Sequence, residues 1–429
     1  METHTVADIE INEITPKALF FNKRMYLVYV LLAIALFGIW DVFYERYFLV
    51  AANAHDAGLN PASRELAHAM KEAVFGAGGE VKREAPWSLY IVNYMYMIYV
   101  GSGIIFLVAL AELMNVELIK RTATGFLTLG LSMIIAGLFT IMMDLNVLHL
   151  YHMFLSPQLS SGMWLMMPLY AVYIPVVMFE IYLLLTKKDC WVKKLAIPIL
   201  VLSILVELVE FYVQAKLFDM NAARHLWTTY PFLTVYFMVS SFVASAAIMI
   251  MYTFFVYRKR DRKNCEKLMA LMKQVTLFAV IALGMYEAIA YLFIDRKWGA
   301  IILFGDFKYF FYLYLLLAIA IPFFLLLKEV TGSLSKILAA FSIVIGTYIG
   351  RIIFVYGGNS YPMSDRFGLG FEKYAEYEPV RELIFFMPPI GEIMVVIGSI
   401  GVVLLVYNLA EAFLSVSEMR DQGDGNSCS

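Results

Sequence analysis

Ionisable and amide side chains recur inside long apolar stretches of this sequence, where they are costly to place. On insertion scales a charged side chain near the centre of a bilayer costs about 2.5–3.5 kcal/mol, so each one needs a partner, water or a function. Glu207 and Glu210 are three residues apart on one helix face, so we expect at least one of them to be protonated or paired. The polar groups that we place toward one end of the stretches are Asn93, Tyr96, Asp144, His149, His152, Glu207, Glu210, Glu287, Arg351 and Glu392.

Two further acids, Glu112 and Glu180, lie toward the other end of the stretches. Acids near both ends suit a proton path, because intramembrane ionisable groups tend to mark pathways and ligand sites. A structural explanation stands beside this one, since Glu112 can reach the membrane interface and Arg351 can neutralise an acid. The residues that we assign to the hypothetical proton path are Glu112, Glu180, Glu287 and Arg351.

The sequence offers no obvious redox centre or metal site. Four of its six histidines fall in predicted tails or loops, which leaves His149 and His152 near one membrane end. A haem between helices usually needs axial ligands on facing helices, and the three scattered cysteines cannot hold an iron–sulfur cluster. We expect neither cofactor in this chain, so any electrons must come from a partner.

The composition places these polar groups in a membrane. Hydrophobic residues make up 62% of the 429 positions and charged residues 16%, whereas soluble domains are near half apolar and a quarter charged. The net charge of -2 gives no overall attraction to nucleic acid. Ten stretches can cross about 30 Å of hydrocarbon, at 25–49, 88–114, 122–146, 162–186, 192–215, 231–257, 268–294, 306–328, 334–358 and 385–413.

An even number of spans puts both termini on one side of the membrane, and the short basic loops indicate which side. Lys120 and Arg121, four lysines within 187–194 and the run from Arg258 to Lys267 fall on the side of the N-terminus. The positive-inside rule predicts that this side is cytoplasmic. Residues 1–24 and 414–429 are then cytoplasmic tails of a multi-pass protein.

An internal repeat organises the spans. Shifting the sequence by 143 residues places spans two to five on spans six to nine, and it aligns Ser102 with Ser245 and Asp144 with Glu287. A repeat of four spans returns to its starting side, so both halves share one orientation. We predict an all-α integral membrane protein with two parallel four-helix bundles, 88–215 and 231–358, and two flanking helices, 25–49 and 385–413.

Several motifs resemble those of a known family. They are Ala85-Pro86-Trp87-Ser88-Leu89-Tyr90 leading through Asn93 to Gly101-Ser102-Gly103, then Asp144-Leu145, and then Leu159-Ser160-Ser161-Gly162-Met163-Trp164. Over roughly residues 86–358 the sequence resembles the NrfD/PsrC family of membrane subunits of bacterial and archaeal respiratory complexes. With ten spans it is most similar to the DsrP/HybB branch. The family's Asp-Leu-Gly-Arg-Pro pattern appears here as Asp144-Leu145-Asn146-Val147-Leu148, without the Arg and the Pro.

The resemblance implies a quinone-reactive subunit of the inner membrane that exchanges electrons with a ferredoxin-like iron–sulfur protein on the outer face. It also implies menaquinone or menaquinol as the bound substrate, a multihaem cytochrome and further membrane subunits as partners, and a setting in sulfur metabolism. In polysulfide-reductase-like members an Asn eight residues before a Gly lines the quinone pocket, and Asn93 and Gly101 reproduce that spacing. The family's pocket His corresponds to Tyr96, and a pocket Tyr on the fourth bundle helix falls near Tyr212.

The chemistry of the residues agrees with this implication. A quinone needs an apolar slot and hydrogen-bond partners for two carbonyls, which Asn and Tyr can supply. Its oxidation or reduction moves two protons, for which the candidate relays are Asp144, His149, Glu207 and Glu210. Two other classes stay open. Buried acids and the spans with Pro175 and Pro322 also suit a secondary transporter or ion-translocating protein, and paired charges suit a structural anchor.

Overall fold

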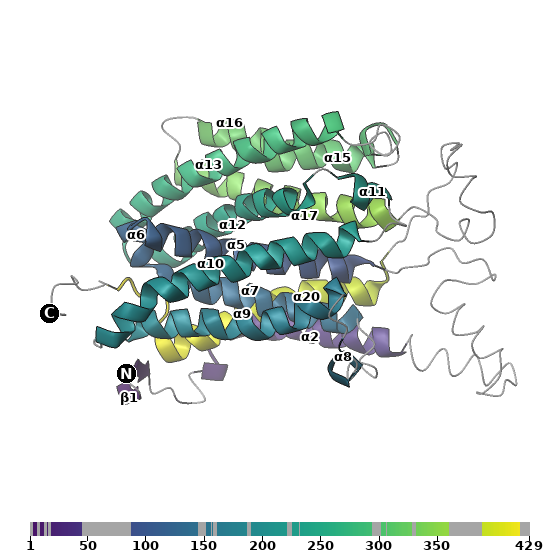
Figure 1. Ribbon diagram of the computed structural model, residues 1–429. Coiled ribbons are helices and arrows are strands. Elements are labelled where there is room, and N and C mark those ends of the chain that lie inside the picture. Colours follow the sequence, from purple (N-terminus) through teal and green to yellow (C-terminus); the bar gives the residue numbers. More distant parts are fainter. Residues whose placement is uncertain are drawn as a thin grey trace, which may run out of the picture.

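Ten helical segments in the described part of the chain are long and apolar enough to cross a membrane. The computed structural model describes residues 3–6, 9–12, 15, 19–44, 87–144, 152–155, 157, 161–186, 190–220, 225–230, 232–293, 302–305, 307–327, 332–359 and 388–420. Within them the long helices lie side by side along one common direction (Figure 1). The predicted all-α, multi-pass membrane protein is therefore confirmed.

The long helices between the two flanking spans form two consecutive groups of four spans. The first bundle contains α5 (Leu89–Leu113), α7 (Ala123–Asp144), α9 (Gly162–Leu185) and α10 (Cys190–Asp219). The second contains α12 (Leu233–Tyr257), α13 (Arg262–Phe293), a combined span of α15 (Lys308–Leu315), η3 (Leu316–Ala320) and α16 (Ile321–Leu327), and α17 (Ser333–Asn359). The short helices are α6 (Glu117–Lys120), α8 (His152–Leu155) and α11 (His225–Thr229).

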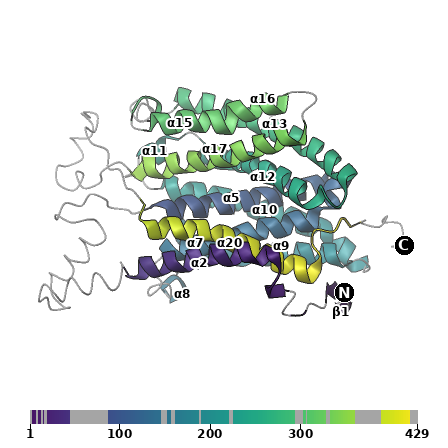
Figure 2. The same cartoon turned by 180° about the vertical axis from the view of Figure 1, so that it is seen from behind.

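The two flanking spans pack on each other. They are α2 (Lys23–Phe43) and α20 (Ile390–Leu414), which run together along one side of the molecule (Figure 2). α20 also packs on α7, so it joins α2 to the first bundle. A short antiparallel hairpin, β1 (Thr3–Val6) and β2 (Ile9–Asn12), precedes α2 within the predicted N-terminal tail and was not expected from the sequence.

Two local features explain how the second bundle departs from the predicted spans. α13 begins before position 268 because Asp261 caps it: the Asn264 backbone N–H donates to Asp261 Oδ1 at 3.1 Å. This hydrogen bond holds the pKa of the Asp261 carboxyl below its usual value. The combined span widens into a π-helix at η3 directly before Pro322, whose ring lacks the N–H that would bond the Ala318 carbonyl.

The two bundles meet where α5 crosses α12. Ser245 of α12 donates a hydrogen bond to the Val100 carbonyl at 2.8 Å, and Ser241 donates to the Tyr99 carbonyl. The close approach depends on Gly103, because a Cβ atom there would clash with the hydroxyl of Ser245. The 143-residue shift aligns α5 with α12, so equivalent helices of the repeat form the crossing.

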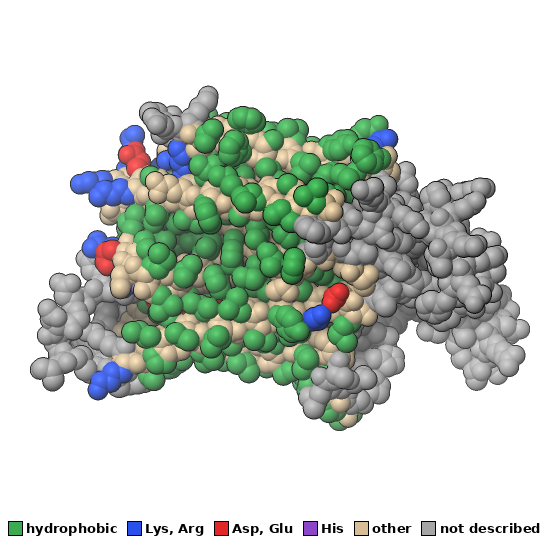
Figure 3. All heavy atoms as spheres, turned by 45° about the horizontal axis from the view of Figure 1, so that its top comes forward, with side chains coloured by type: hydrophobic (Ala, Val, Ile, Leu, Met, Phe, Trp, Pro, Cys, Tyr) green, Lys and Arg blue, Asp and Glu red, His purple; other side chains and the backbone are tan. Residues whose placement is uncertain are grey.

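Hydrophobic side chains cover the middle of the molecular face in Figure 3, and Lys and Arg side chains gather at one end. We call this the basic end, and it contains the turns before α7 and before α13 with Lys120, Arg121, Arg258, Lys259, Arg260 and Arg262. We call the other end, where α5 begins and α17 ends, the far end. An apolar belt bounded by a basic end is the surface expected of a chain that spans a bilayer.

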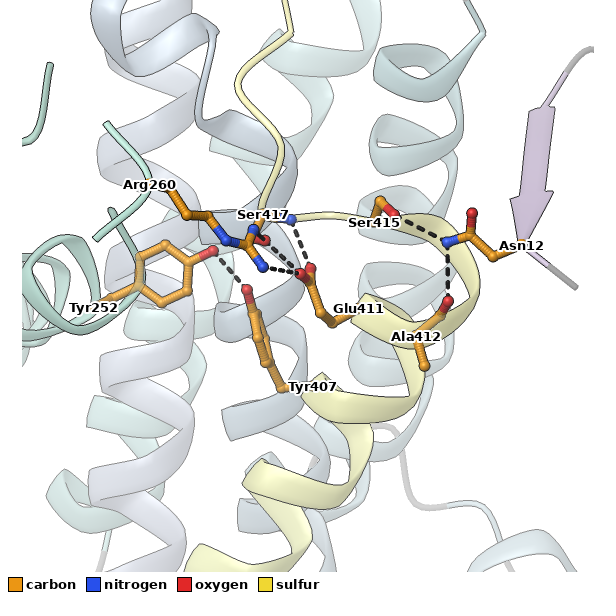
Figure 4. Close-up of polar contacts among 8 residues, drawn as sticks. All are labelled: Asn12, Tyr252, Arg260, Tyr407, Glu411, Ala412, Ser415 and Ser417. Carbon is orange, nitrogen blue, oxygen red and sulfur yellow. Dashed lines mark hydrogen bonds and ion pairs between the residues drawn. The ribbon is translucent and has the colours of Figure 1, made fainter. Parts of the chain in front are cut away.

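The segment after α20, residues 415–420, joins the two bundles at the basic end, and we call it the terminal clasp. Arg260, before α13, pairs with Glu411 Oε1 at 3.2 Å and also donates to Ser417 (Figure 4). Glu411 accepts a further hydrogen bond from the Ser417 backbone N–H at 2.8 Å. Arg420 donates its backbone N–H to the Arg121 carbonyl of the first bundle at 3.0 Å. The clasp therefore contacts turns of both bundles.

Two further contacts shown in Figure 4 hold the end of α20 in place. Asn12 of β2 donates to the Ala412 carbonyl at 3.0 Å and to Ser415 Oγ at 2.9 Å. Tyr252 of α12 and Tyr407 of α20 share a hydrogen bond of 2.6 Å between their hydroxyls. The hairpin is thus attached to the same end of the molecule as the clasp.

Replacing Glu411 with Ala should lower the free energy of unfolding by about 1–3 kcal/mol, because Arg260 and Ser417 lose a shared acceptor at a partly buried site. The change is measured as a lower Tm of the purified chain in detergent. Glu266→Ala is the matched control, since Glu266 forms an exposed pair with Arg262 of about 0.3–0.5 kcal/mol. A Glu411→Ala protein as stable as the control would contradict the clasp's stabilising role.

Gly101→Ala should destabilise the first bundle by about 1–3 kcal/mol through overpacking. A Cβ atom at Gly101 would lie 2.6 Å from the Gly130 carbonyl oxygen of α7, and a backbone atom cannot rotate away. Gly284→Ala is the control, because its Cβ would meet only Ile319 at 3.4 Å. Thermal unfolding in detergent should give a lower Tm for the first variant and an unchanged or higher Tm for the second. The reverse order would refute this account of the α5–α7 contact.

Candidate functional site

Two buried carboxyls face two phenols between α9 and α10. Tyr173 donates a hydrogen bond to Glu207 Oε1 at 2.7 Å, and Tyr170 donates to Glu210 Oε1 at 2.9 Å. Both glutamates are 0% exposed. The pairs align because each helix places its two partners three residues apart on one face. We call these four residues the carboxyl–phenol ladder.

Polar side chains extend the ladder toward α5. Gln214, one turn after Glu210, donates from Nε2 to Glu210 Oε1 at 2.7 Å. Tyr94 of α5 lies within hydrogen-bonding range of Tyr170, and Ser102 lies beside Glu210. The interior of the first bundle is therefore polar over several turns of helix.

Glu112 and Glu180 continue the series of acids toward the basic end. Glu180 is buried on α9 beside Ser203, and it interacts electrostatically with Glu112 and with Glu207. Glu112 lies next to the end of α5 and interacts with Lys120. The acids from Glu112 to Glu210 thus form a series of electrostatic neighbours within the first bundle.

A second polar cluster lies near the far end, where α5, α7, α17 and α20 meet, and we call it the Asn93 cluster. Asn93 Nδ2 donates to Thr140 Oγ1 at 2.9 Å and to Ser399 Oγ at 3.0 Å. Tyr348 donates to Asn93 Oδ1 at 3.5 Å, and its ring packs edge-on against Tyr96 with centroids 5.0 Å apart. The structure therefore brings Asn93 and Tyr96 together and adds Tyr348.

Both predicted pocket residues are held by protein partners. Each polar atom of the Asn93 amide takes part in the hydrogen bonds of the cluster. The Tyr96 hydroxyl donates to the Val344 carbonyl at 3.1 Å and lies 3.4 Å from Thr347 Oγ1. The Tyr348 contact is the longest of the Asn93 hydrogen bonds, so Tyr348 is the member that exchanges its acceptor most easily.

The structure places two of the remaining predicted site residues, Asp144 and Tyr212, at other positions. Asp144 is the last residue of α7 and is half-buried at the far end, and His149 lies outside the described residues. Tyr212 is 53% exposed on the outer side of α10, while Phe211 points inward and stacks on Tyr99 with centroids 5.4 Å apart. Adjacent helix positions point about 100° apart, so Tyr212 faces away from the interior that Phe211 enters.

The second bundle holds a buried acid and a buried cation. Tyr314 of α15 donates to Glu287 Oε1 of α13 at 2.6 Å. Arg351 of α17 is 3% exposed and donates to Ser240 Oγ at 2.6 Å. Its guanidinium carbon lies 4.8–5.2 Å from the ring centroids of Tyr99, Tyr236 and Phe237. Arg351 forms no ion pair with the residues that the structure describes, so aromatic rings take the place of an acid here.

Several polar partners were missed by reasoning from the sequence. Tyr170 and Tyr173 repeat the three-residue spacing of the two glutamates, so comparing the spacing of neighbouring spans would have found them. Tyr348 and Ser399 carry no such signal, because their role depends on how α17 and α20 pack. Among the described residues, no three His, Cys, Asp or Glu side chains come together as possible metal ligands.

Comparison with known proteins gives the family of the chain. A search of curated proteins found no match. Residues 80–362 match the family model of polysulphide reductase NrfD, a stretch that includes both bundles and leaves α2 and α20 outside. Members of this family are quinone-interacting membrane subunits of respiratory oxidoreductases that typically partner with an iron–sulfur subunit. The match covers well over half of the sequence, and the chain belongs to the polysulphide reductase NrfD family.

Proposed function

We propose that this chain binds a quinone or quinol at the Asn93 cluster and exchanges electrons with an iron–sulfur subunit docked at the far end of the bundle. The observation that carries the proposal is the meeting of one buried amide, Asn93, with the buried phenol of Tyr96 and the half-buried phenol of Tyr348, close to that end. Family membership supports the ligand class.

The cluster has the chemistry that a quinone needs. A quinone ring requires an apolar slot and hydrogen-bond donors for its carbonyl oxygens. Tyr348 carries a phenol whose present acceptor, Asn93 Oδ1, is distant at 3.5 Å, so a ring carbonyl can replace it at a shorter distance. Tyr96 offers an aromatic edge beside the same position. Asn93, fixed by Thr140 and Ser399, orients Tyr348 for this exchange.

Proton exchange belongs to the same proposal. Quinone chemistry moves protons together with electrons, and buried groups that can hold a proton serve as relays. Asp144, at the far end of α7, and His149 are the relays that we propose nearest the ring. The proposed relay continues toward the basic end through Glu210, Glu207, Glu180 and Glu112. The phenols of Tyr170 and Tyr173 hold the carboxyls of Glu210 and Glu207 in place without adding a charge.

The orientation follows from the loops. The basic end carries the Lys and Arg residues of the short loops, so we propose that it is cytoplasmic and that the far end faces outward. An iron–sulfur partner then docks on the outer side of the inner membrane. Menaquinone as the quinone, a multihaem cytochrome and further membrane subunits as partners, and a setting in sulfur metabolism complete the proposal.

Tyr348→Phe should lower quinol-dependent turnover of the assembled complex by about 5- to 10-fold, since it removes one hydrogen bond to the ring. Asn93→Leu should lower it further. Turnover is measured as electron transfer between a short-tailed naphthoquinol and the iron–sulfur partner. Tyr212→Phe is the matched control and should be unchanged, because Tyr212 points outward. Unchanged kinetics in both Tyr348→Phe and Asn93→Leu would remove the Asn93 cluster from the mechanism.

Glu207→Gln and Glu180→Gln should slow proton-coupled turnover by about tenfold or more, because an amide cannot pass on a proton. The shape of each side chain is kept, so the Tm should change little. Turnover and proton movement are followed together in vesicles with a pH-sensitive dye. Glu117→Gln is the control, since Glu117 pairs with Arg121 on the exposed surface. Normal turnover and normal proton movement in both variants would exclude these acids from the path.

A further inference from the structure

The repeat maps the proposed site onto a second position in the same chain. The 143-residue shift that aligns the bundles places Asn93 on Tyr236 and Asp144 on Glu287. In the structure Tyr236 packs against Tyr286, the neighbour of Glu287, with ring centroids 5.5 Å apart. Tyr236 and Glu287 are thus close on α12 and α13, the counterparts of α5 and α7.

The second position also contains a donor and an acceptor with free hydrogen-bonding capacity. Glu287 Oε1 accepts from Tyr314, whereas Glu287 Oε2 and Arg351 Nη1 are buried and have no hydrogen-bond partner in the described part of the chain. The two groups interact electrostatically without forming an ion pair at contact distance. Tyr236 interacts electrostatically with both groups, and its ring centroid lies 5.2 Å from the Arg351 guanidinium carbon. Buried polar atoms without partners are costly and ask for an explanation.

Access from the membrane distinguishes the second position from the first. α20 covers α7 and supplies Ser399 to the Asn93 cluster. On α13, the counterpart of α7, the side chains of Met285, Ile289 and Leu292 are exposed on the surface that faces lipid, and Tyr286 beside them is half-buried. An apolar ring dissolved in the bilayer can therefore approach Tyr286, the neighbour of the buried Glu287, from the side.

We propose that the second bundle binds a second isoprenoid quinone or quinol, with its ring beside Tyr236 and Tyr286 and its oxygens between Glu287 and Arg351. Arg351 Nη1 donates to a ring oxygen, and a hydroxyl of the reduced ring donates to Glu287 Oε2. The rings of Tyr236 and Tyr286 supply stacking partners. The ligand class rests on the proposed function, whereas the site uses other residues, and binding here involves no electron transfer.

Binding stoichiometry tests the proposal. The purified complex in lipid nanodiscs is titrated with a short-tailed naphthoquinol under anaerobic conditions, and bound ligand is counted by equilibrium dialysis. We expect two molecules for each copy of the chain. Glu287→Gln and Tyr286→Leu should each weaken one of the two sites by about tenfold or more and leave the other unchanged. Tyr252→Phe at the basic end is the control and should leave both sites unchanged.

The outcomes separate this site from the Asn93 cluster. Asn93→Leu should remove the other molecule and spare the one held by Glu287. A single molecule that is lost in Asn93→Leu and kept in Glu287→Gln and Tyr286→Leu would overturn the second site and leave the proposed function standing. A single molecule with the opposite dependence would support the second site and overturn the Asn93 cluster. No bound naphthoquinol at all would overturn both.

Discussion

The close crossing of α5 over α12 is the contact on which the rest of the structure depends. Gly103 allows the backbones to approach, and Ser241 then bonds the Tyr99 carbonyl. That fixes Tyr99, whose ring stacks on Phe211 of the first bundle and also lies under the Arg351 guanidinium of the second. One aromatic ring thus contacts side chains from both halves of the repeat. Any change in the crossing would move the buried cation relative to the acids of the first bundle.

Phenols, and not opposite charges, are the main partners of the buried acids. A lysine or arginine at 170 or 173 would neutralise Glu210 or Glu207 but would favour a permanently ionised carboxylate. A tyrosine donates a hydrogen bond and stays neutral. When the carboxyl takes up or loses a proton, the charge of the tyrosine–carboxyl pair therefore changes by one. The buried guanidinium of Arg351 is likewise partnered without an opposite charge, because aromatic rings surround it. Phenols and aromatic rings therefore supply neutral partners for these buried groups.

The sequence predicted the spans well because their hydrophobicity is high and their length is set by the bilayer. It also singled out Glu207, Glu210 and Asn93, since polar residues are rare in such stretches. It could not predict the orientation of Tyr212, because helices that are apolar on all sides give no periodic signal for their inward face. The contact of Ser399 with Asn93 and the clasp at Glu411 join residues about 300 and 150 positions from their partners. Only the packed arrangement of α20 reveals them.

The pairing of α2 with α20 constrains the order in which the helices can assemble. α2 packs mainly on α20, yet almost the whole chain must be synthesised between the two helices. At about 5–20 residues per second, the first helix waits in the bilayer on the order of tens of seconds before its partner arrives. During that time Gly38, which finally contacts the backbone of Gly391, faces lipid or the insertion machinery. The flank formed by α2 and α20 can therefore assemble only after both bundles have been synthesised.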